Sequence, residues 1–352
     1  MLKLAPILLI LSLLFSINMA AQGSCQEDID KANKLFENGS YNDAEKLLKK
    51  ILVTCSLNQT QENEILKLIA SVNYEMDELE KGDEYTAEFL KKNPYYTPNK
   101  KTDPLPFREA IQKLKSWPRF YFGFRGGISM GFVDTKKVYP VLDTADYNKP
   151  YTIKPYFLGA LEFGWNIRSF MSLNLGAGLR IQKIQHQVPQ YNQYYFNYEE
   201  ITKTLNVPLT IHFSIPTGGA FFPDLYFGGE YEYFTGATYS YAYTGNSNIS
   251  QDFTFYLNRK RNNVTIQKDE RAAYRYAALG GIRLMYKIKN FSLYADGRYI
   301  KEYNLYNNPQ KRYTDPDLNI GNNYTLADIQ LQNLDISIGF NYYFSYKVKS
   351  KY

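Results

Sequence analysis

The sequence predicts two parts, a small all-α region followed by an all-β, eight-stranded antiparallel barrel that crosses a membrane. Three observations carry this prediction: an export-like N-terminus, helical periodicity over the next hundred residues, and strict period-2 alternation from Pro118 onward. We expect a signal peptide over 1–22, a helical region with its linker over 23–117 and the barrel over 118–352. The mean hydropathy of −0.44 does not oppose a barrel, because its loops and inward face are polar.

The first residues are typical of a secretory signal peptide. Lys3 precedes the apolar run Leu4–Phe15, and the small residues Ala20 and Ala21 follow it. The run is shorter than the roughly 20 residues that a transmembrane helix needs. Export also permits a disulfide. We therefore expect Cys25 and Cys55 to be bridged, with two free thiols as the alternative.

From Gln26 to about Leu114 the apolar residues recur at spacings of three and four, as on one face of a helix. The pattern resembles a tetratricopeptide repeat, with a poorer second copy about 38 residues later in which Asp77 stands at the mid-repeat glycine position. The residues at the motif's positions are Ala32, Gly39, Tyr41, Ala44, Leu48 and, closing the second copy, Pro94. Such repeats imply a concave protein-docking face. The alternative is a helical spacer without a ligand.

Eight segments then alternate apolar and polar residues. In Arg168–Gln185 the side chains of Leu173, Leu175 and Leu179 point one way, and Arg180 points the other. A strand tilted across a bilayer needs about 9–11 residues, which this segment provides. The eight predicted strands lie near 120–130, 154–167, 168–185, 204–213, 225–233, 274–286, 291–299 and 333–344.

The connections between these strands alternate between short and long. The long ones are 134–152, 186–200, 241–270 and 303–330. Outer-membrane barrels have short periplasmic turns and long external loops, and an even number of strands. A soluble β-sandwich is the alternative, and it does not predict this alternation of loop lengths. We expect the bacterial outer membrane as location, with the N-terminal domain in the periplasm.

The polar face of the strands carries five bases and five acids. An eight-stranded barrel is just wide enough for side chains to fill it, so a balanced ion network favours a plugged core over an open pore. The predicted lumenal residues are Arg125, Glu162, Arg180, Glu230, Glu232, Arg275, Arg283, Asp296, Arg298 and Asp335.

Three segments carry a resemblance to the PorT-like outer-membrane β-barrel family of the Bacteroidota. They are the run from Phe122 to Gly127 (FGFRGG), the run from Leu205 to Leu209 (LNVPL) and the closing run from Gly339 to Phe344 (GFNYYF). The resemblance covers about 118–352 and implies an outer-membrane location. It implies little about activity, because such barrels share a scaffold and differ in loops and attached domains.

The sequence does not favour an enzyme, a cofactor or a metal site. The chain has two histidines: His186 lies at the rim of a predicted loop, and His212 faces the lumen beside Thr210. Nucleophile-elbow, zinc-protease and phosphate-loop motifs are absent. The chain has 41 basic and 35 acidic residues, and the basic residues are not clustered in one block of the sequence. Nucleic acid is therefore not an expected partner.

We therefore expect a non-enzymatic protein in contact with outer-membrane lipid, whose helical domain docks a periplasmic or membrane protein in envelope assembly or secretion. Two alternatives remain open. One is small-solute transport through the barrel. The other is adhesion or ligand binding by the outer loops 241–270 and 303–330.

Overall fold

The computed structural model describes residues 25–139, 150–190, 194–215, 217, 219–245 and 260–350. They form two compact units, a helical unit and a strand unit. The strand unit spans Arg119–Phe344, and the helical unit takes the residues up to Pro118 together with the segment 345–350. The predicted signal peptide and parts of the predicted loops 134–152 and 241–270 lie outside the described residues.

The helical unit begins with a helix over 25–37. The helices that follow are α2 (Tyr41–Thr54), α3 (Gln59–Glu75), α4 (Leu79–Lys92) and α5 (Leu105–Lys113). The turns after the first and third helices both place one residue in the left-handed region, Gly39 with φ 76° and Asp77 with φ 60°. Glycine adopts this conformation freely, and aspartate is among the side chains that adopt it most readily. Asp77 therefore makes the turn that the repeat pattern assigns to a glycine.

Local sequence explains where the third helix begins. Asn58 caps α3 by accepting from the Gln61 amide, while the Gln61 side chain accepts from the Asn58 amide. This reciprocal pair satisfies two amides that the first helical turn leaves without partners. The apolar faces of the first three helices meet in a buried cluster that includes Ile29, Leu48 and Ile69.

The last residues of the chain pack within the helical unit. Ser345 has φ 52°, Tyr346 stacks edge-on against Tyr95 with ring centroids 5.8 Å apart, and Val348 packs on the cluster that contains Phe89 and Phe107. The structure thus differs from the predicted limits at this end: the segment 345–350 belongs with the helices, whereas the sequence assigned it to the barrel.

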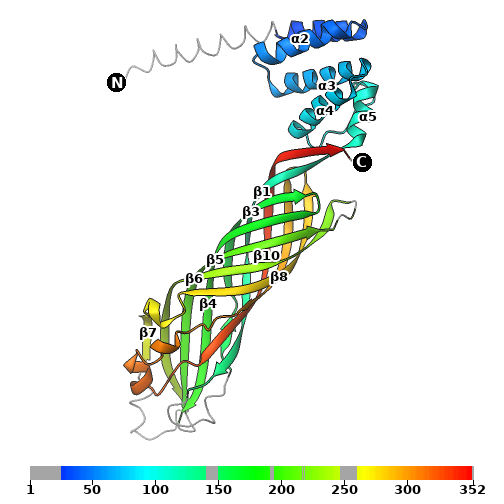
Figure 1. The fold of residues 1–352 in the computed structure, drawn as a ribbon. Coiled ribbons are helices and arrows are strands. Elements are labelled where there is room, and N and C mark those ends of the chain that lie inside the picture. Colours follow the sequence, from blue (N-terminus) through cyan, green and yellow to red (C-terminus); the bar gives the residue numbers. More distant parts are fainter. Residues whose placement is uncertain are drawn as a thin grey trace, which may run out of the picture. The chain divides into compact units, whose positions relative to one another are not determined.

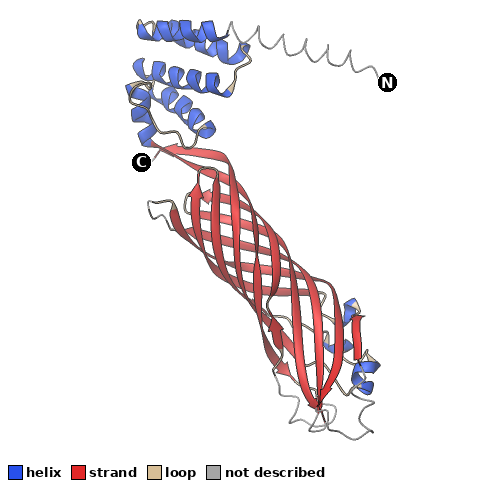
Figure 2. Cartoon of the chain, turned by 180° about the vertical axis from the view of Figure 1, so that it is seen from behind, coloured by secondary structure: helices blue, strands red, loops and turns tan. Residues whose placement is uncertain are grey.

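Eight strands form a closed ring in the described part of the chain (Figures 1 and 2). They are β1 (Leu114–Lys137), β3 (Tyr156–Arg168), β4 (Met171–Gln190), β5 (Tyr194–Ser214), β6 (Phe221–Gly245), β8 (Tyr274–Ile288), β9 (Phe291–Glu302) and β10 (Asp328–Ser350). Each pairs with its neighbours in the order β4-β3-β1-β10-β9-β8-β6-β5, and β5 pairs back onto β4. The predicted eight-stranded architecture is confirmed at this level.

Two short strands and three short helical turns complete the described elements at the end of the ring that carries the long connections. They are β2 (Thr152–Lys154), β7 (Lys260–Thr265), η3 (Lys268–Glu270), η4 (Pro309–Lys311) and η5 (Asp317–Gly321). β2 pairs with β4, and β7 pairs with β6. We call this end the loop end and the opposite one the turn end.

The prediction of a loop over 186–200 is wrong. β4 continues to Gln190 and β5 starts at Tyr194, so most of this segment is a strand hairpin in register, with Gln187 opposite Asn197. The outward positions in this segment include the polar residues Gln187 and Asn197, while Val188 and Phe196 remain buried. The loss of outward apolar residues removed the signal by which we assigned strands.

The outer face of the ring is apolar between these ends. Its apolar side chains are between 58% and 74% exposed at Phe122, Phe157, Leu179, Leu284 and Ile338. The full set of outward residues includes at least one large apolar side chain from each of the eight strands. Among the described residues, no helix is both long and apolar enough to cross a membrane.

Inside the ring, tyrosine rings lie over glycines of neighbouring strands. A Cβ added to Gly164 would strike the ring of Tyr121, and one added to Gly281 would strike the ring of Tyr226. The absence of a side chain at these glycines gives the tyrosine rings room to lie flat against the wall. The interior is therefore filled with aromatic and charged side chains.

Candidate functional site: the ion network and the helical groove

The ten predicted lumenal residues all lie inside the ring, each at most 3% exposed. They come from seven of the eight strands, and the period-2 rule placed every one of them on the inner face. They lie in one connected network of ion pairs.

The half of the network nearer the turn end is centred on Glu162. Its carboxylate lies 3.1 Å from Arg125 Nε, 2.9 Å from Arg283 Nη2 and 3.6 Å from Arg298 Nη2. Asp296 accepts from Arg283 Nε at 3.0 Å, so it neutralises a second charge in this group. Three guanidinium groups here face two carboxylates.

The half nearer the loop end is centred on Arg180. Its guanidinium contacts Glu230 at 2.9 Å, Asp335 at 3.2 Å and Glu232. Arg275 then donates to Glu232 at 2.6 Å. The two halves are joined where Arg125 Nη1 lies 3.9 Å from Asp335.

One member of this network was not among the predicted lumenal residues. Glu302, the last residue of β9, is 1% exposed and lies 2.8 Å from Arg275 Nε. It continues the inward series Asp296, Arg298, Ile300, so the same periodicity extended by one step would have found it. The network thus holds five arginines and six carboxyl groups, where an equal number was predicted.

A second buried ion pair lies beyond Glu302 toward the loop end. Arg271 donates to both oxygens of Glu200 at 2.8 and 2.7 Å, and the hydroxyls of Tyr198 and Tyr306 donate to the same carboxylate at 2.6 Å each. Arg271 lies between the predicted loop 241–270 and the predicted strand 274–286, and no periodicity indicates its burial.

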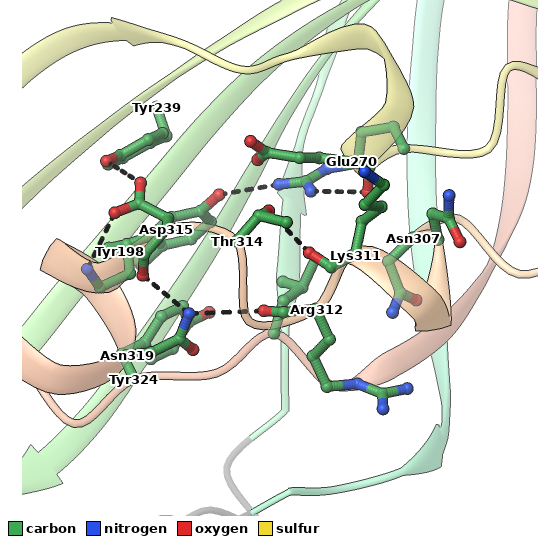
Figure 3. Close-up of a pocket in the computed structure, with 14 residues that line it drawn as sticks. Tyr198, Tyr239, Glu270, Asn307, Lys311, Arg312, Thr314, Asp315, Asn319 and Tyr324 are labelled. Carbon is green, nitrogen blue, oxygen red and sulfur yellow. Dashed lines mark hydrogen bonds between the residues drawn. The ribbon is translucent and has the colours of Figure 1, made fainter.

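Aromatic side chains close the loop end above this pair. Phe196, Tyr198, Tyr241 and Tyr324 form part of one buried cluster, into which the connection 303–330 folds. Tyr239 donates to Asp315 at 2.5 Å, and Asn319 to the Asp315 carbonyl at 2.7 Å (Figure 3). The cavity between these residues measures about 30 Å³, the volume of one water molecule. It is too small for a ligand.

Both histidines are buried. His186 stacks on Tyr151, with ring centroids 3.8 Å apart. His212 Nδ1 lies 2.7 Å from Asp224 and its Nε2 lies 2.9 Å from Thr210 Oγ1. This order of carboxylate, imidazole and hydroxyl is that of a hydrolase triad. Because Thr210 is only 3% exposed, its hydroxyl lies out of reach of a substrate, and the contacts serve to satisfy buried polar groups.

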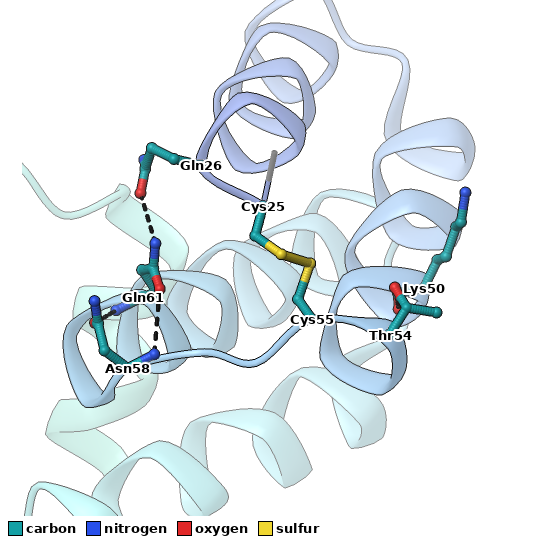
Figure 4. Close-up of a disulfide and its surroundings, with 7 residues drawn as sticks. All are labelled: Cys25, Gln26, Lys50, Thr54, Cys55, Asn58 and Gln61. Atoms are coloured by element: carbon teal, nitrogen blue, oxygen red, sulfur yellow. Dashed lines mark hydrogen bonds between the residues drawn. A yellow bond between two sulfur atoms is a disulfide. The ribbon is translucent and has the colours of Figure 1, made fainter. Parts of the chain in front are cut away.

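In the described residues no group of three or more histidine, cysteine, aspartate or glutamate side chains could hold a metal ion. The two cysteines are joined: Cys25 and Cys55 form a disulfide between the first helix and the residue after α2 (Figure 4). Beside it, Gln61 donates to Gln26 at 3.1 Å and ties the start of α3 to the first helix.

The repeat-motif residues take structural positions in the helical unit. Ala32, Ala44 and Leu48 are fully buried between helices, and the Tyr41 ring packs on Phe36 at 5.7 Å. Gly39 makes the first turn, and Pro94, just after α4, accepts a hydrogen bond from Ser116 at its carbonyl. None of them contacts a ligand-sized cavity, so their role is packing and turning.

A groove of about 590 Å³ lies along the helical unit. Its lining residues are Asn33, Phe36, Glu37, Thr60, Asn63, Glu64, Lys67, Leu68, Phe89, Asn93, Tyr96, Thr102 and Pro104. The amides of Asn63 and Asn93 bond to each other at 2.6 and 3.1 Å, and Asn33 donates to Glu64 at 3.2 Å. The repeat pattern predicts a docking face but does not indicate which residues line it.

One ion pair lies beside the groove, and its lysine, Lys67, is among the lining residues. Lys67 Nζ lies 3.0 Å from Asp103 and 2.6 Å from the Tyr96 hydroxyl, which also donates to Asp103. Desolvation opposes the ionised form of Asp103, but hydrogen bonds from Tyr96, from the Asn99 amide and from Lys67 outweigh it and lower the pKa of Asp103. The pair therefore holds the connector after α4 against α3.

The sequence matches no protein-family model and no curated protein sequence. Among solved structures, the chain is similar to the outer membrane protein OprG from Pseudomonas aeruginosa at 13% identity, with a TM-score of 0.34 over 64% of this chain and 97% of that chain. It is also similar to outer membrane protein W of Escherichia coli at 12% identity and a TM-score of 0.31, over 64% of this chain and 98% of that chain. A third similar structure is the outer membrane protease OmpT of Escherichia coli, at 10% identity and a TM-score of 0.25, over 64% of this chain and 97% of that chain.

All three are outer-membrane proteins. Likeness at these TM-scores carries no inference about the activity of this chain. Since one of the three is a protease, the prediction that the chain is not an enzyme stays a prediction.

Proposed function

We propose that this chain is a non-enzymatic outer-membrane β-barrel protein whose helical unit, in the periplasm, docks an extended segment of a partner protein. The observation that carries the proposal is the groove of the helical unit, which combines ligand-sized volume with amide and carboxylate side chains. The ring of strands then serves as the anchor.

The apolar outer face supports a membrane location. On β8 the outward tyrosines Tyr274 and Tyr276 stand near one edge of the apolar surface and Tyr286 near the other, with Ile282 and Leu284 between them. Ten residues of a strand tilted by about 35–45° rise roughly 25 Å, which is the height of the apolar band of outer-membrane barrels. Aromatic side chains at both edges of such a band are typical of these proteins.

The disulfide supports a periplasmic position for the helical unit. Disulfides persist in the bacterial periplasm and are rare in the cytosol. Cys25 and Cys55 lie in the same part of the chain as the predicted export signal, and the turn end of the ring has the short connections expected on the periplasmic side.

The chemistry of the groove favours a peptide segment over a small apolar ligand. Asn63 uses one donor and one acceptor on the pair with Asn93, so it keeps capacity for a peptide C=O and a peptide N–H. Asn93 also donates to the Phe89 carbonyl at 3.3 Å, so its remaining capacity is as an acceptor for a peptide N–H. Phe36, which is half-buried, provides apolar contact for side chains. Glu37 and Glu64 add negative charge, so a segment with basic residues is favoured.

Site-specific photocrosslinking in cells tests this proposal. A photoreactive amino acid at Thr60, which is exposed in the groove, should capture a discrete protein band in the full-length protein. The same amino acid at Glu84, exposed on α4 outside the groove lining, is the matched control. The change Glu64→Lys should weaken capture from Thr60. Equal capture from both positions, or none from either, would count against docking.

A second candidate function is ligand binding at the loop end. The β4–β6 hairpins continue beyond the apolar belt and present a polar outer row, in which Gln187 donates to Asn197 and Asn197 to Thr244 at 3.0 and 2.8 Å. If this surface is adhesive, shortening the 241–270 connection should abolish binding of cells to a surface and leave crosslinking from Thr60 unchanged.

A further inference from the structure

We infer that the outer surface of the ring carries a binding site for one anionic membrane lipid, with a groove for an acyl chain and Lys301 for the phosphate group. This inference rests on the proposed membrane location. It goes beyond general lipid contact, because it assigns a preference for head-group charge to one place on the ring.

The groove lies on the outer wall where β5, β6 and β8 run side by side, and it measures about 450 Å³. Its floor is shallow because Gly229 and Ala278 are register partners with no large side chain, and Leu209 completes the row. Val207 and Leu209 form one apolar wall. This volume is within the range of small-molecule sites, about 300–1,000 Å³.

Three tyrosines line the same groove toward the loop end: Tyr231, Tyr276 and Tyr303. The rings of Tyr231 and Tyr276 are 5.5 Å apart, and the Tyr303 amide donates to the Tyr276 carbonyl at 2.9 Å. Tyrosine at a membrane interface places its ring in the apolar region and its hydroxyl among the head groups. The groove therefore passes from an apolar floor to a hydroxyl-bearing rim.

A lysine stands beside this rim. Lys301 is exposed and is the register partner of Ala278, so both side chains leave the same face of adjacent strands. Directly opposite residues on one face have Cβ atoms about 4.5–5.5 Å apart. The ammonium group is thus within reach of a phosphate whose acyl chain occupies the groove, and it complements the charge of an anionic lipid.

A second outward groove differs from the first in having no basic residue beside it among the described residues. It measures about 490 Å³ and lies between Phe122, Phe124, Phe163 and Phe340. None of its lining residues in the described part of the chain is a lysine or an arginine, and their outward register partners, such as Leu293 for Phe340, are apolar. It can accept an acyl chain but has no group that would select for a charged head.

Native mass spectrometry of the full-length protein tests the inference. Equimolar phosphatidylglycerol and phosphatidylcholine with identical acyl chains serve as probes. One lysine near a membrane surface favours an anionic lipid about fivefold. We expect the wild type and Lys301→Arg to retain phosphatidylglycerol over phosphatidylcholine by about that factor as the first bound lipid. Lys301→Gln should retain the two lipids equally. Lys289→Gln, in the β8–β9 turn, is the control and should keep the preference.

A second pair of variants tests the groove itself. A Cβ at Gly229 has as its nearest neighbour the Ala277 carbonyl at 3.7 Å, so Gly229→Leu fills the groove without displacing the wall. It should reduce retention of both lipids at this site. Gly159→Leu adds the same side chain to the outer face of β3, where no atom lies within 4 Å of the new Cβ, and it should leave retention unchanged.

The outcomes separate this inference from the proposed function. A protein that inserts into membranes but retains phosphatidylglycerol equally well with Lys301→Gln overturns the lipid site and leaves the membrane location intact. A protein that does not insert into membranes overturns both.

Discussion

Glu162 makes more ion pairs than any other described carboxyl group inside the ring, with three arginines within 3.6 Å. Glu302 makes one, with Arg275. Removing one partner from a buried network leaves the other charges uncompensated, which costs about 3–5 kcal/mol. Glu162→Gln should therefore lower the free energy of unfolding by about that amount.

The matched variant Glu302→Gln should lower the free energy of unfolding by much less. The network contains six carboxyl groups and five guanidinium groups, so replacing the acid Glu302 leaves equal numbers of the two. Urea unfolding followed by heat-modifiable migration in gels measures both variants. Equal losses in the two proteins would show that the excess of carboxyl groups has no energetic consequence.

Asp103 gives a prediction about pH. Its folded-state pKa is lowered, so its contribution to the stability of the helical unit is complete above the unfolded value of about 3.9 and is lost as the pH falls through the folded pKa. Hydrogen exchange of α3, compared between wild type and Asp103→Asn at each pH, should show a difference at about pH 6 that shrinks toward about pH 3. A difference that is constant with pH would assign the stabilisation to packing.

At the scale of elements, the disulfide fixes the first helix. It closes a loop with a sequence separation of 30, for which loop-closure entropy predicts about 3–4 kcal/mol of stabilisation. Replacing both Cys25 and Cys55 by serine should raise hydrogen exchange in the helix over 25–37 and in α2 more than in α5. Uniform loosening of all the helices would contradict this.

The paired tyrosines and glycines of the ring give a second prediction at this scale. Gly281→Ala places a Cβ against the Tyr226 ring and the Gly297 carbonyl, and overpacking of this kind costs about 1–3 kcal/mol. Gly297→Ala on β9 adds a Cβ with no atom within 4 Å, so it should be near neutral. Urea midpoints of the two variants provide the measurement, and a neutral Gly281→Ala would mean that the tyrosine can move aside.

For the molecule as a whole, period-2 alternation was enough to predict the strands within the apolar belt and the inward position of charges such as Arg180 and Asp335. Beyond the belt it failed, because outward residues such as Gln187 and Asn197 are as polar as the residues of a loop. The packing of the segment 345–350 on the helices depends on contacts between distant residues, Tyr95 and Tyr346, which no local pattern reveals.

The functional residues were predicted less completely than the fold. The ion network followed from periodicity, but Arg271 and the groove residues Asn63 and Asn93 depend on how separate segments pack. The PorT-like resemblance and the tetratricopeptide-like character of the helices remain predictions from the sequence.

The central claim is that the interior of the ring is a structural core, so that the protein is an anchor and not a pore. Planar-bilayer recording of the purified full-length protein tests it most directly. Because the five arginines and six carboxyl groups fill the interior beneath an aromatic cluster, we expect no sustained discrete conductance. Reproducible conductance steps from the folded, heat-modifiable protein would contradict the account.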